Sequence, residues 1–412
     1  MRYLARSFAI PGDHAGQSST GVRMPFGGVG VITPFNFPLE IPALQTCSAL
    51  FMGNQPLAKV DWKVAIVMEQ VRGIARFSQA TPAPLTPSLT ACGSSALQFI
   101  RMLHHVGLPK TDLDYIYCDG PVMNETLVQG DARMTLFTGS QAVADKLTID
   151  LKGRVKLEDA GFDWKILGPD PTDVDYVVWQ SDQDAYAFSG QKCSAQSMLL
   201  VHENWMKVGV IDKLAARAGQ RSLEDMTLGP VLTWSTDKIL AHVDACLKVP
   251  GASLAFGGKP LGGHDIPPQY GAVQATAVHI PLKAMLESEE VFKLATTELF
   301  GPFQVITDYK EGELPLVLEL LNKMQNHLTA GIVSNDNHFL HEVLGNTING
   351  TIYAGIRAKT TAAPQQHWFG PSGDPRSAGI HTPEAIKLCW SSHREIIYDY
   401  GPVAKDWVAK QS

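Results

Sequence analysis

Short apolar runs alternate with helical patterns along this chain of 412 residues, which is typical of an α/β fold. A strand and a turn at Pro11-Gly12-Asp13 are predicted near the N-terminus, and Thr138-Gly139-Ser140 is predicted to open a helix that reaches about Leu151. Further strands are predicted at residues 30–32, 56–60, 134–137, 176–178 and 198–201, and the end of a helix at 50–52. The last two strands are assigned to a second domain.

Residues 71–98 break this pattern with 28 residues that carry three prolines, many Ser and Thr, and almost no periodicity, which indicates loop or disorder. The flanking segments KVAIVMEQ and FIRMLHHVGLP read as two halves of one amphipathic helix. If Gln70 preceded Phe99 directly, the apolar residues would fall at helical spacing. The sequence therefore predicts an insert at 71–98.

The origin of the insert has two interpretations. Val codons start with GT, one Gln codon is CAG, and the segment from Val71 to Gln98 keeps the reading frame. These ends match those of an intron, so a retained intron or gene-model error is one hypothesis. A genuine surface insertion is the other.

Composition excludes several classes of protein. A formal charge of −7 without a long basic run argues against nucleic acid or an anionic membrane as the main partner. Prolines and polar residues interrupt the most apolar stretch, residues 27–53, so no transmembrane segment is predicted. The six cysteines have no CxxC pairing or metal-ligand spacing, which predicts free thiols, a reducing compartment and no metal site.

The candidate chemistry is centred on Cys193, within the stretch AFSGQKCSAQ. A nucleophilic cysteine needs access, a nearby base and donors for the oxyanion that forms on attack. Asn36 in PFNFP, Lys59 at a strand end, Glu158 in KLEDAG and Glu298 in ELFGP supply polar groups of the required kinds. Taken singly, each is as well explained by a turn, a surface or a packing role, and a lone cysteine is most often a small core residue.

Together these segments resemble the aldehyde dehydrogenase family. TPFNFP is similar to its TPWNFP motif, FTGS to its coenzyme loop, KLEDAG to LELGG, GQKCSAQ to GQxCxA and ELFGP to EIFGP. All five occur in the family's order, and the resemblance covers residues 3–70 and 99–404. Within the family, the sequence resembles most the plant-type branch that oxidises pyrroline-5-carboxylate, in its open form glutamate 5-semialdehyde. The segments that carry this resemblance include SFAIPGDHAGQ, HWFGPSGDPRSAGIHTPEAIKL and HREIIYDYGPV.

The resemblance implies an α/β fold with a Rossmann-like coenzyme domain, an α/β catalytic domain and oligomerisation strands. The implied boundaries are 3–24 and 395–412 for oligomerisation, 25–158 for a partial coenzyme domain, 159–370 for the catalytic domain, and 371–394 for a return to the coenzyme side. Because only 35 residues precede Asn36, we expect the first elements of the coenzyme domain to be lost.

The implied catalytic residues are Cys193, Glu158 and Asn36. Cys193 would attack the aldehyde to form a thiohemiacetal, and the Asn36 amide and the Cys193 backbone N–H would hold the oxyanion. After hydride transfer leaves a thioester, Glu158 would activate the water that hydrolyses it.

The implied coenzyme is NAD, with NADP not excluded. Gly139 and Ser140 would face the pyrophosphate at a helix N-terminus, Lys59 the adenosine ribose, and Glu298 and Phe300 the nicotinamide ribose. The family's KPSE motif is KVDW here, so Trp62 replaces the glutamate and Asp61 supplies the nearest carboxylate. No GxGxxG fingerprint is present.

For the substrate, Arg376 and Ser377 would anchor the α-carboxylate, because an arginine fork binds two oxygens. Phe188 would line the aldehyde channel.

The expected activity is oxidation of glutamate 5-semialdehyde to glutamate in proline breakdown, by a homodimer or larger assembly in the mitochondrial matrix, although no transit peptide is recognisable. The alternatives are an aldehyde dehydrogenase with another substrate, or a truncated, non-catalytic partner of a full-length subunit.

Overall fold

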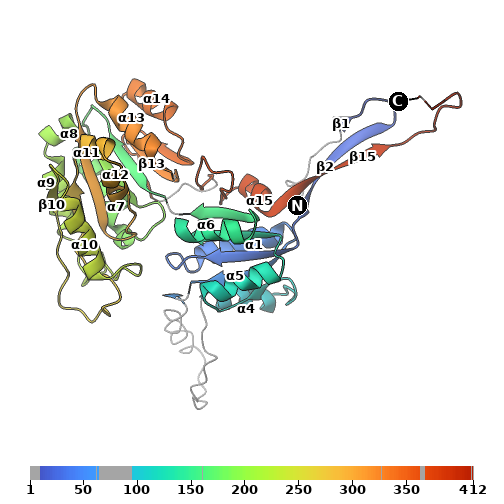
Figure 1. Cartoon of the computed structure of the whole chain (residues 1–412), viewed down its shortest axis with the longest axis horizontal. Coiled ribbons are helices and arrows are strands. Elements are labelled where there is room, and N and C mark those ends of the chain that lie inside the picture. The colour runs from blue at the N-terminus through green and yellow to red at the C-terminus, as the bar shows by residue number, and fades with distance from the viewer. Residues whose placement is uncertain are drawn as a thin grey trace, which may run out of the picture. The chain divides into compact units, whose positions relative to one another are not determined.

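The computed structural model describes residues 10–61, 63–64, 95–159, 161–325, 327–361, 367–409 and 411. The chain forms two compact units (Figure 1). Unit 1 comprises residues 1–137, 146–156 and 378–412, and unit 2 comprises residues 138–145 and 157–377. None of the helices in the described ranges has the length and apolar character needed to cross a membrane.

A five-stranded sheet of order β5-β4-β3-β6-β7 forms the centre of unit 1. Its strands are β3 (Gly28–Thr33), β4 (Gln55–Val60), β5 (Asp114–Tyr115), β6 (Met134–Gly139) and β7 (Val155–Asp159). The accompanying helices are α1 (Glu40–Phe51), α4 (Ser95–His105), α5 (Gly120–Gln129), α6 (Gln141–Asp150) and α15 (Pro383–Trp390). The strands predicted at 30–32, 56–60 and 134–137 and the helix end at 50–52 are thereby confirmed.

Gly30 lets α5 approach the centre of this sheet. A Cβ atom at Gly30 would lie 2.5 Å from Leu127 Cδ2 and 2.9 Å from Thr135 Oγ1, closer than van der Waals contact allows. Val29 and Val31 pack with Leu136 in a core that also includes Trp390 of α15. The C-terminal segment therefore completes the core of the five-stranded sheet.

A separate antiparallel sheet joins the two ends of the chain. It has the order β1-β2-β15, with β1 (Ile10–Pro11), β2 (Gln17–Pro25) and β15 (Ser391–Asp399). β2 and β15 lie side by side along nine residue pairs, from Ser391↔Pro25 to Asp399↔Gln17 (Figure 1). The strand predicted from the composition of HREIIYDYG is confirmed, since most of this segment lies in β15.

Unit 2 is built on a seven-stranded sheet of order β10-β11-β12-β9-β8-β13-β14, parallel except for the β10–β11 pair. The strands are β8 (Asp163–Leu167), β9 (Gln196–His202), β10 (Ser253–Phe256), β11 (Thr276–His279), β12 (Phe303–Tyr309), β13 (Thr329–Val333) and β14 (Thr351–Ala354). The helices are α7 (Val174–Tyr186), α8 (Glu203–Lys207), α9 (Val210–Ala218), α10 (Thr236–Leu247), α11 (Leu282–Glu287), α12 (Glu289–Ala295), α13 (Leu314–Lys323) and α14 (Asn337–Gly345). The strand predicted at 198–201 is confirmed.

Both faces of this sheet are buried, as expected of a parallel sheet. Trp164 and Ile166 pack toward a large core with residues of α10 to α13, whereas Leu167 packs on the other face with Val177 of α7 and Leu214 of α9. The resulting three-layer arrangement is that of a doubly wound α/β domain.

The prediction of a strand at Tyr176–Val178 was wrong, because these residues lie in α7. Val177, Val178, Ser181 and Ala185 are buried along this helix, and their separations of one, three and four residues are helical. The three apolar residues alone do not distinguish a strand from a helix.

The predicted loop at 71–98 was wrong at its end, since α4 begins at Ser95 rather than at Phe99. Ile100 is buried against Ala58 and Leu113, with Leu103 packed beside it, which gives the helix its apolar face. Residues 71–94 and the preceding half-helix after Val64 lie outside the described residues.

Candidate active site

The segment that carries Cys193 begins with an unusual backbone. α7 continues into a 3-10 turn, η2 (Ala187–Gly190), in which Phe188, Ser189 and Gly190 all have positive φ, at 61°, 55° and 64°. The left-handed region is unfavourable for residues other than glycine. Such a run therefore needs support from its surroundings, as is common at functional sites.

Hydrogen bonds from a neighbouring loop supply that support. The Gln191 side chain donates to the Pro230 carbonyl at 3.0 Å and accepts from Leu232 N at 2.9 Å. Ser189 Oγ accepts from Gly229 N at 2.7 Å. Ser189 within the turn and Gln191 directly after it are thus fixed to one loop before the chain reaches Cys193.

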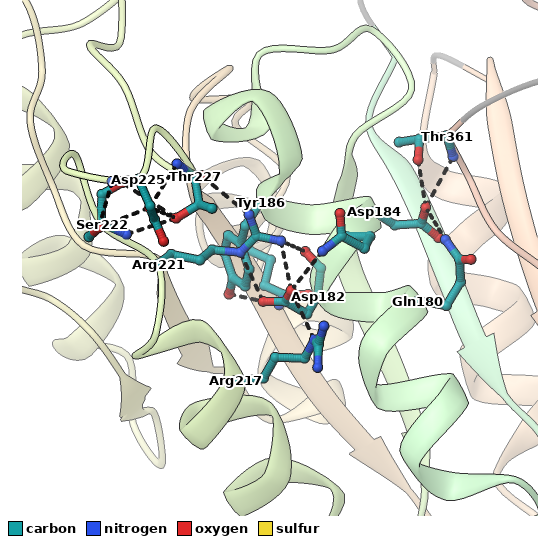
Figure 2. Close-up of polar contacts among 12 residues, drawn as sticks. Gln180, Asp182, Asp184, Tyr186, Arg217, Arg221, Ser222, Asp225, Thr227 and Thr361 are labelled. Carbon is teal, nitrogen blue, oxygen red and sulfur yellow. Dashed lines mark hydrogen bonds and ion pairs between the residues drawn. The ribbon is translucent and has the colours of Figure 1, made fainter.

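The polar side chains of α7 anchor this helix in the interior (Figure 2). Arg221 donates to both oxygens of Asp182, at 3.1 Å and 2.7 Å, and Asp182 is almost fully buried. Asp184 forms an ion pair with Lys165 Nζ at 2.6 Å and accepts from Thr361 Oγ1 at 2.7 Å. Because buried charges need such partners, these contacts fix the helix that leads to the nucleophile.

Cys193 is a free, partly exposed thiol that lies near the carboxyl group of Glu158. Burial raises the pKa of Cys193 well above its usual value; the charge of Glu158 adds to this effect, and Asp163 and Glu298 would add to it when ionised. The resting thiol therefore keeps its proton at neutral pH, with a carboxyl group in place to accept it.

Glu158 lies near the end of β7 and is 2% exposed. The segment that contains Arg376 and Ser377 runs beside it, because Leu157 N donates to the Arg376 carbonyl at 2.9 Å and Leu157 forms a parallel bridge with Ser377. The backbones of three predicted site residues, Glu158, Arg376 and Ser377, are thus neighbours.

The Arg376 guanidinium is held by carboxylates of the chain itself. Its Nε donates to Asp374 at 3.0 Å and 3.1 Å, its Nη2 donates to Asp374 at 2.5 Å, and its Nη1 reaches Asp145 at 3.4 Å. These carboxylates raise the pKa of Arg376 further. The arrangement supports a structural role, and substrate anchoring by Arg376 stays a prediction.

Glu298 and Phe300 line a small pocket together with Gly190 and Ala195, which flank Cys193. Burial raises the pKa of Glu298 well above its usual value, and nearby Asp163 raises it further. Phe300 has a φ of 47°, and Thr233 Oγ1 donates to the Leu299 and Phe300 carbonyls at 3.2 Å and 3.3 Å. Phe188 is 55% exposed, as a channel residue would be.

The remaining predicted residues are associated with the five-stranded sheet. Asn36 is 4% exposed, and its Oδ1 has no hydrogen-bond partner among the described residues. Lys59 is 8% exposed in β4 and close enough to Cys118 to lower the pKa of that thiol, which burial raises more strongly.

Gly139 ends β6 and Ser140 precedes α6, where the Ser140 carbonyl accepts the first helical bond from Ala144 N at 3.0 Å. Ser140 is exposed, so the helix start is open to a ligand's phosphate. Asp61 is paired with Lys63 at 3.4 Å, and Trp62 lies outside the described residues.

Asp163 was not among the predicted site residues. It is fully buried at the start of β8, where Thr329 N donates to its Oδ1 at 2.6 Å. When ionised, Asp163 would raise the pKa of both Cys193 and Glu298. An acid directly before the apolar strand WKIL is the one signal that the sequence offered.

Comparison with known proteins gives the context of this site. The profile described as "Aldehyde dehydrogenase family" matches residues 3–80 and 82–373. The chain is 58% identical over 407 residues to "Delta-1-pyrroline-5-carboxylate dehydrogenase 12A1, mitochondrial" of Arabidopsis thaliana, covering 99% of this chain and 68% of that protein. It is 28% identical over 344 residues to "1-pyrroline-5-carboxylate dehydrogenase" of Bacillus subtilis, covering 79% and 58% of the two chains.

Solved structures show the same fold. An NAD-dependent aldehyde dehydrogenase from Sinorhizobium meliloti aligns with a TM-score of 0.78 at 18% identity, covering 98% of this chain and 72% of the other. Betaine aldehyde dehydrogenase from Staphylococcus aureus aligns with a TM-score of 0.76 at 20% identity, covering 98% and 73%. The fold, the ordered motifs and the family match agree, and the chain belongs to the aldehyde dehydrogenase family.

Proposed function

We propose that this protein oxidises L-glutamate 5-semialdehyde, the open form of pyrroline-5-carboxylate, to L-glutamate. The 58% identity with the Arabidopsis pyrroline-5-carboxylate dehydrogenase supports the substrate. The observation that supports the chemistry is the proximity of the Glu158 carboxyl group to the Cys193 thiol, whose pKa it raises. It pairs a nucleophile with a base, as covalent catalysis on an aldehyde requires.

In the first step, Cys193 Sγ forms a bond to the aldehyde carbon while its proton passes to Glu158. The carbonyl oxygen becomes an oxyanion, which the Cys193 backbone N–H would stabilise. The Asn36 amide is the second donor implied by the family resemblance. The product of this step is a thiohemiacetal on Cys193.

A bound nicotinamide dinucleotide would supply the hydride acceptor for the carbon attached to the Cys193 sulfur, so that the thiohemiacetal would become a thioester. Glu298 and Phe300 would hold its nicotinamide ribose, and their position in a pocket beside the nucleophile segment supports this role. Gly139 and Ser140 would offer the open start of α6 to the pyrophosphate, and Lys59 would contact the adenosine ribose. NAD is the preferred coenzyme in this proposal.

The thioester is then hydrolysed by water. Glu158 first releases to solvent the proton that it took from Cys193. It then takes a proton from the attacking water, the carbon–sulfur bond breaks, and Cys193 leaves as the thiolate and is protonated by Glu158. Because Glu158 is almost fully buried, its carboxylate acts in a site with little competing solvent.

The substrate's amino acid head would be recognised by the Arg376–Ser377 segment through Ser377, with Phe188 along the path of the aldehyde, while the Arg376 side chain stays paired with Asp374 and Asp145. The proximity of the Arg376–Ser377 backbone to Leu157, next to Glu158, supports this assignment. A backbone or hydroxyl contact from Ser377 is consistent with an Arg376 side chain that is already paired.

We further propose a homodimer or larger homo-oligomer that uses the β1-β2-β15 sheet, and a mitochondrial location by analogy with the Arabidopsis relative, whose name includes it. Exposed apolar side chains on both faces of β15 support an assembly role, since Ile397 is 65% and Tyr398 on the opposite face is 40% exposed. Small-molecule aldehydes remain the expected partners, rather than nucleic acids or membranes.

The test is NADH formation by the purified full chain with pyrroline-5-carboxylate and NAD. Turnover should disappear in Cys193→Ala and persist in the matched control Cys47→Ala. Absence of turnover at saturating coenzyme would contradict catalysis by this chain. Oxidation of other aldehydes, such as succinate semialdehyde, without oxidation of pyrroline-5-carboxylate would reject the substrate alone.

A further inference from the structure

Buried polar side chains line the edge of the seven-stranded sheet where its parallel strands begin. Asp163 on β8, Gln196 on β9, Gln304 on β12 and Thr329 on β13 are each at most 1% exposed. The strands continue from these positions with apolar residues. Because buried polar groups without partners are costly, this edge must satisfy its own hydrogen bonds.

Part of the edge is a chain of hydrogen bonds with one direction. Gln196 Nε2 donates to Gln304 Oε1 at 2.7 Å, and Gln304 Nε2 donates to the Tyr186 hydroxyl at 2.8 Å. Tyr186 in turn donates to the Thr276 carbonyl at 3.1 Å. Every donor points away from Asp163, so the chain needs a donor at its start.

Asp163 lies where that donor is needed. Asp163 and Gln196 are register partners on adjacent parallel strands, whose side chains at paired positions share a face. Asp163 Oδ1 accepts from Thr329 N, but Asp163 Oδ2 and Gln196 Oε1 are buried and have no hydrogen-bond partner among the described residues. A proton on Asp163 Oδ2 would satisfy both oxygens at once.

An ionised Asp163 would require the opposite arrangement. Gln196 would have to donate to Asp163, Gln304 to Gln196, and Tyr186 to Gln304, so the Thr276 carbonyl would lose its donor. This reversed chain has three hydrogen bonds, whereas the observed direction with a protonated Asp163 has four. An unpaired buried charge adds a further cost.

The charged groups around Asp163 are already paired or carry the same sign. Lys165, two residues along β8, is bound to Asp184 at 2.6 Å. Asp182, near Tyr186, is bound by Arg221 at 2.7 Å (Figure 2). Burial lowers the pKa of Lys192, and the negative charges of Asp184 and Cys193 partly oppose this effect.

The groups of the proposed site that Asp163 affects are the Cys193 thiol and the Glu298 carboxyl, and the latter is itself an acid. Burial raises the pKa of Asp163 well above its usual value. A negative charge on Asp163 would raise the pKa of both Cys193 and Glu298.

We propose that Asp163 is a positioning residue: its carboxyl holds a proton, donates it to Gln196 Oε1 and so completes a one-way hydrogen-bond chain that fixes the start of the strand behind Cys193. The neutral acid also spares the Cys193 thiolate an additional negative neighbour during the reaction. The positioning role rests on the proposed function, but the proton on Asp163 is detectable without turnover.

Infrared difference spectroscopy of the full chain at neutral pH tests the proton. The spectrum of the unmodified protein minus that of Asp163→Asn should contain the carbonyl stretch of a protonated carboxylic acid, shifted in D2O. Matched spectra of Glu298→Gln and Glu158→Gln assign the bands of the other two buried carboxyls. Carboxylate bands in place of the protonated carbonyl would overturn the proposal, whether or not the protein turns over.

The variant Gln196→Leu tests the donation, because it leaves Asp163 intact and removes its acceptor. The Asp163 carbonyl band should move to higher wavenumber, and an unmoved band would refute the Asp163–Gln196 bond. In the active enzyme, kcat should fall about tenfold with less than about threefold change in KM, whereas the exposed control Gln269→Leu should change neither. An unchanged kcat in Gln196→Leu would remove the positioning role.

Discussion

The carboxyl group of Glu158 lies close enough to the Cys193 thiol to raise its pKa, although the two residues are 35 positions apart in the sequence. Burial is the main cause of the raised pKa of Cys193, and Glu158 is the largest contributor among the charges. The same carboxylate therefore has two opposite effects in the proposed mechanism. It disfavours the free thiolate at rest, and it accepts a proton during the reaction.

Replacing Glu158 should separate these two effects. We expect Glu158→Gln to lower kcat by about 10²- to 10⁴-fold, since a general base is lost. Alkylation of Cys193 by iodoacetamide at pH 7 should become faster, because removal of the negative charge lowers the pKa of the thiol. A variant that lost both turnover and alkylation would indicate a misfolded site, and circular dichroism would check this.

The coenzyme affinity should depend on pH through Glu298. Since the pKa of Glu298 is raised, the carboxyl keeps its proton to a higher pH than an ordinary glutamate, and only the ionised form accepts two ribose hydroxyl bonds. Binding of NAD should therefore tighten as pH rises through the pKa of Glu298. Titration calorimetry at several pH values measures this, and Glu298→Gln should bind more weakly with a flat profile. An equally steep profile in that variant would exclude Glu298 as the cause.

The ion pair between Lys165 and Asp184 should be costly to break from one side. Both side chains are 0% exposed, so Lys165→Met or Asp184→Asn alone should destabilise unit 2 by about 3–5 kcal/mol. The double variant should recover part of this loss, because no uncompensated charge remains. Thermal denaturation compares the stability of the two single variants with that of the double variant. A loss in the double variant equal to the sum of the two single losses would contradict coupling between the residues.

Arg376 offers a test between a structural and a substrate role. Because Asp374 and Asp145 engage its guanidinium, we expect Arg376→Met to lower the denaturation midpoint and Asp374→Asn to do the same. KM for pyrroline-5-carboxylate should change by less than about threefold. A rise in KM of about a hundredfold at unchanged stability would instead assign Arg376 to the substrate carboxylate.

Acid should weaken the contact between β11 and β12 of the seven-stranded sheet. The hydrogen bond from His279, at 2.6 Å, lowers the pKa of Asp308 below its usual value. The contribution is present above the pKa of the unfolded chain and is lost as pH falls through the lower folded-state pKa. Asp308 is 37% exposed, so Asp308→Asn should cost less than about 1 kcal/mol at pH 7 and nothing at pH 2. Urea denaturation at the two pH values measures this difference.

The sequence predicted those parts of the molecule in which local pattern and final structure agree. Strands such as β3 and β9 combine apolar runs with turn signals, and the motif around Cys193 is contiguous. Tyr176–Val178 failed because a short apolar run fits either a strand or one face of a helix. Asp163 and its bond to Thr329 depend on which strands lie side by side, and this register is not encoded in any one segment.

Position 190 accommodates only glycine without strain, because there is no room for a Cβ atom. A Cβ atom at this position would lie 2.2 Å from the Gly301 carbonyl oxygen, and the φ of 64° is itself unfavourable for an alanine. Gly301 ends the Glu298–Gly301 loop, and Gly190 begins the approach to Cys193. A larger residue at Gly190 would therefore displace the Glu298–Gly301 loop from the segment that carries Cys193. One substitution would thus alter the distance between the proposed coenzyme-binding residues and the proposed nucleophile.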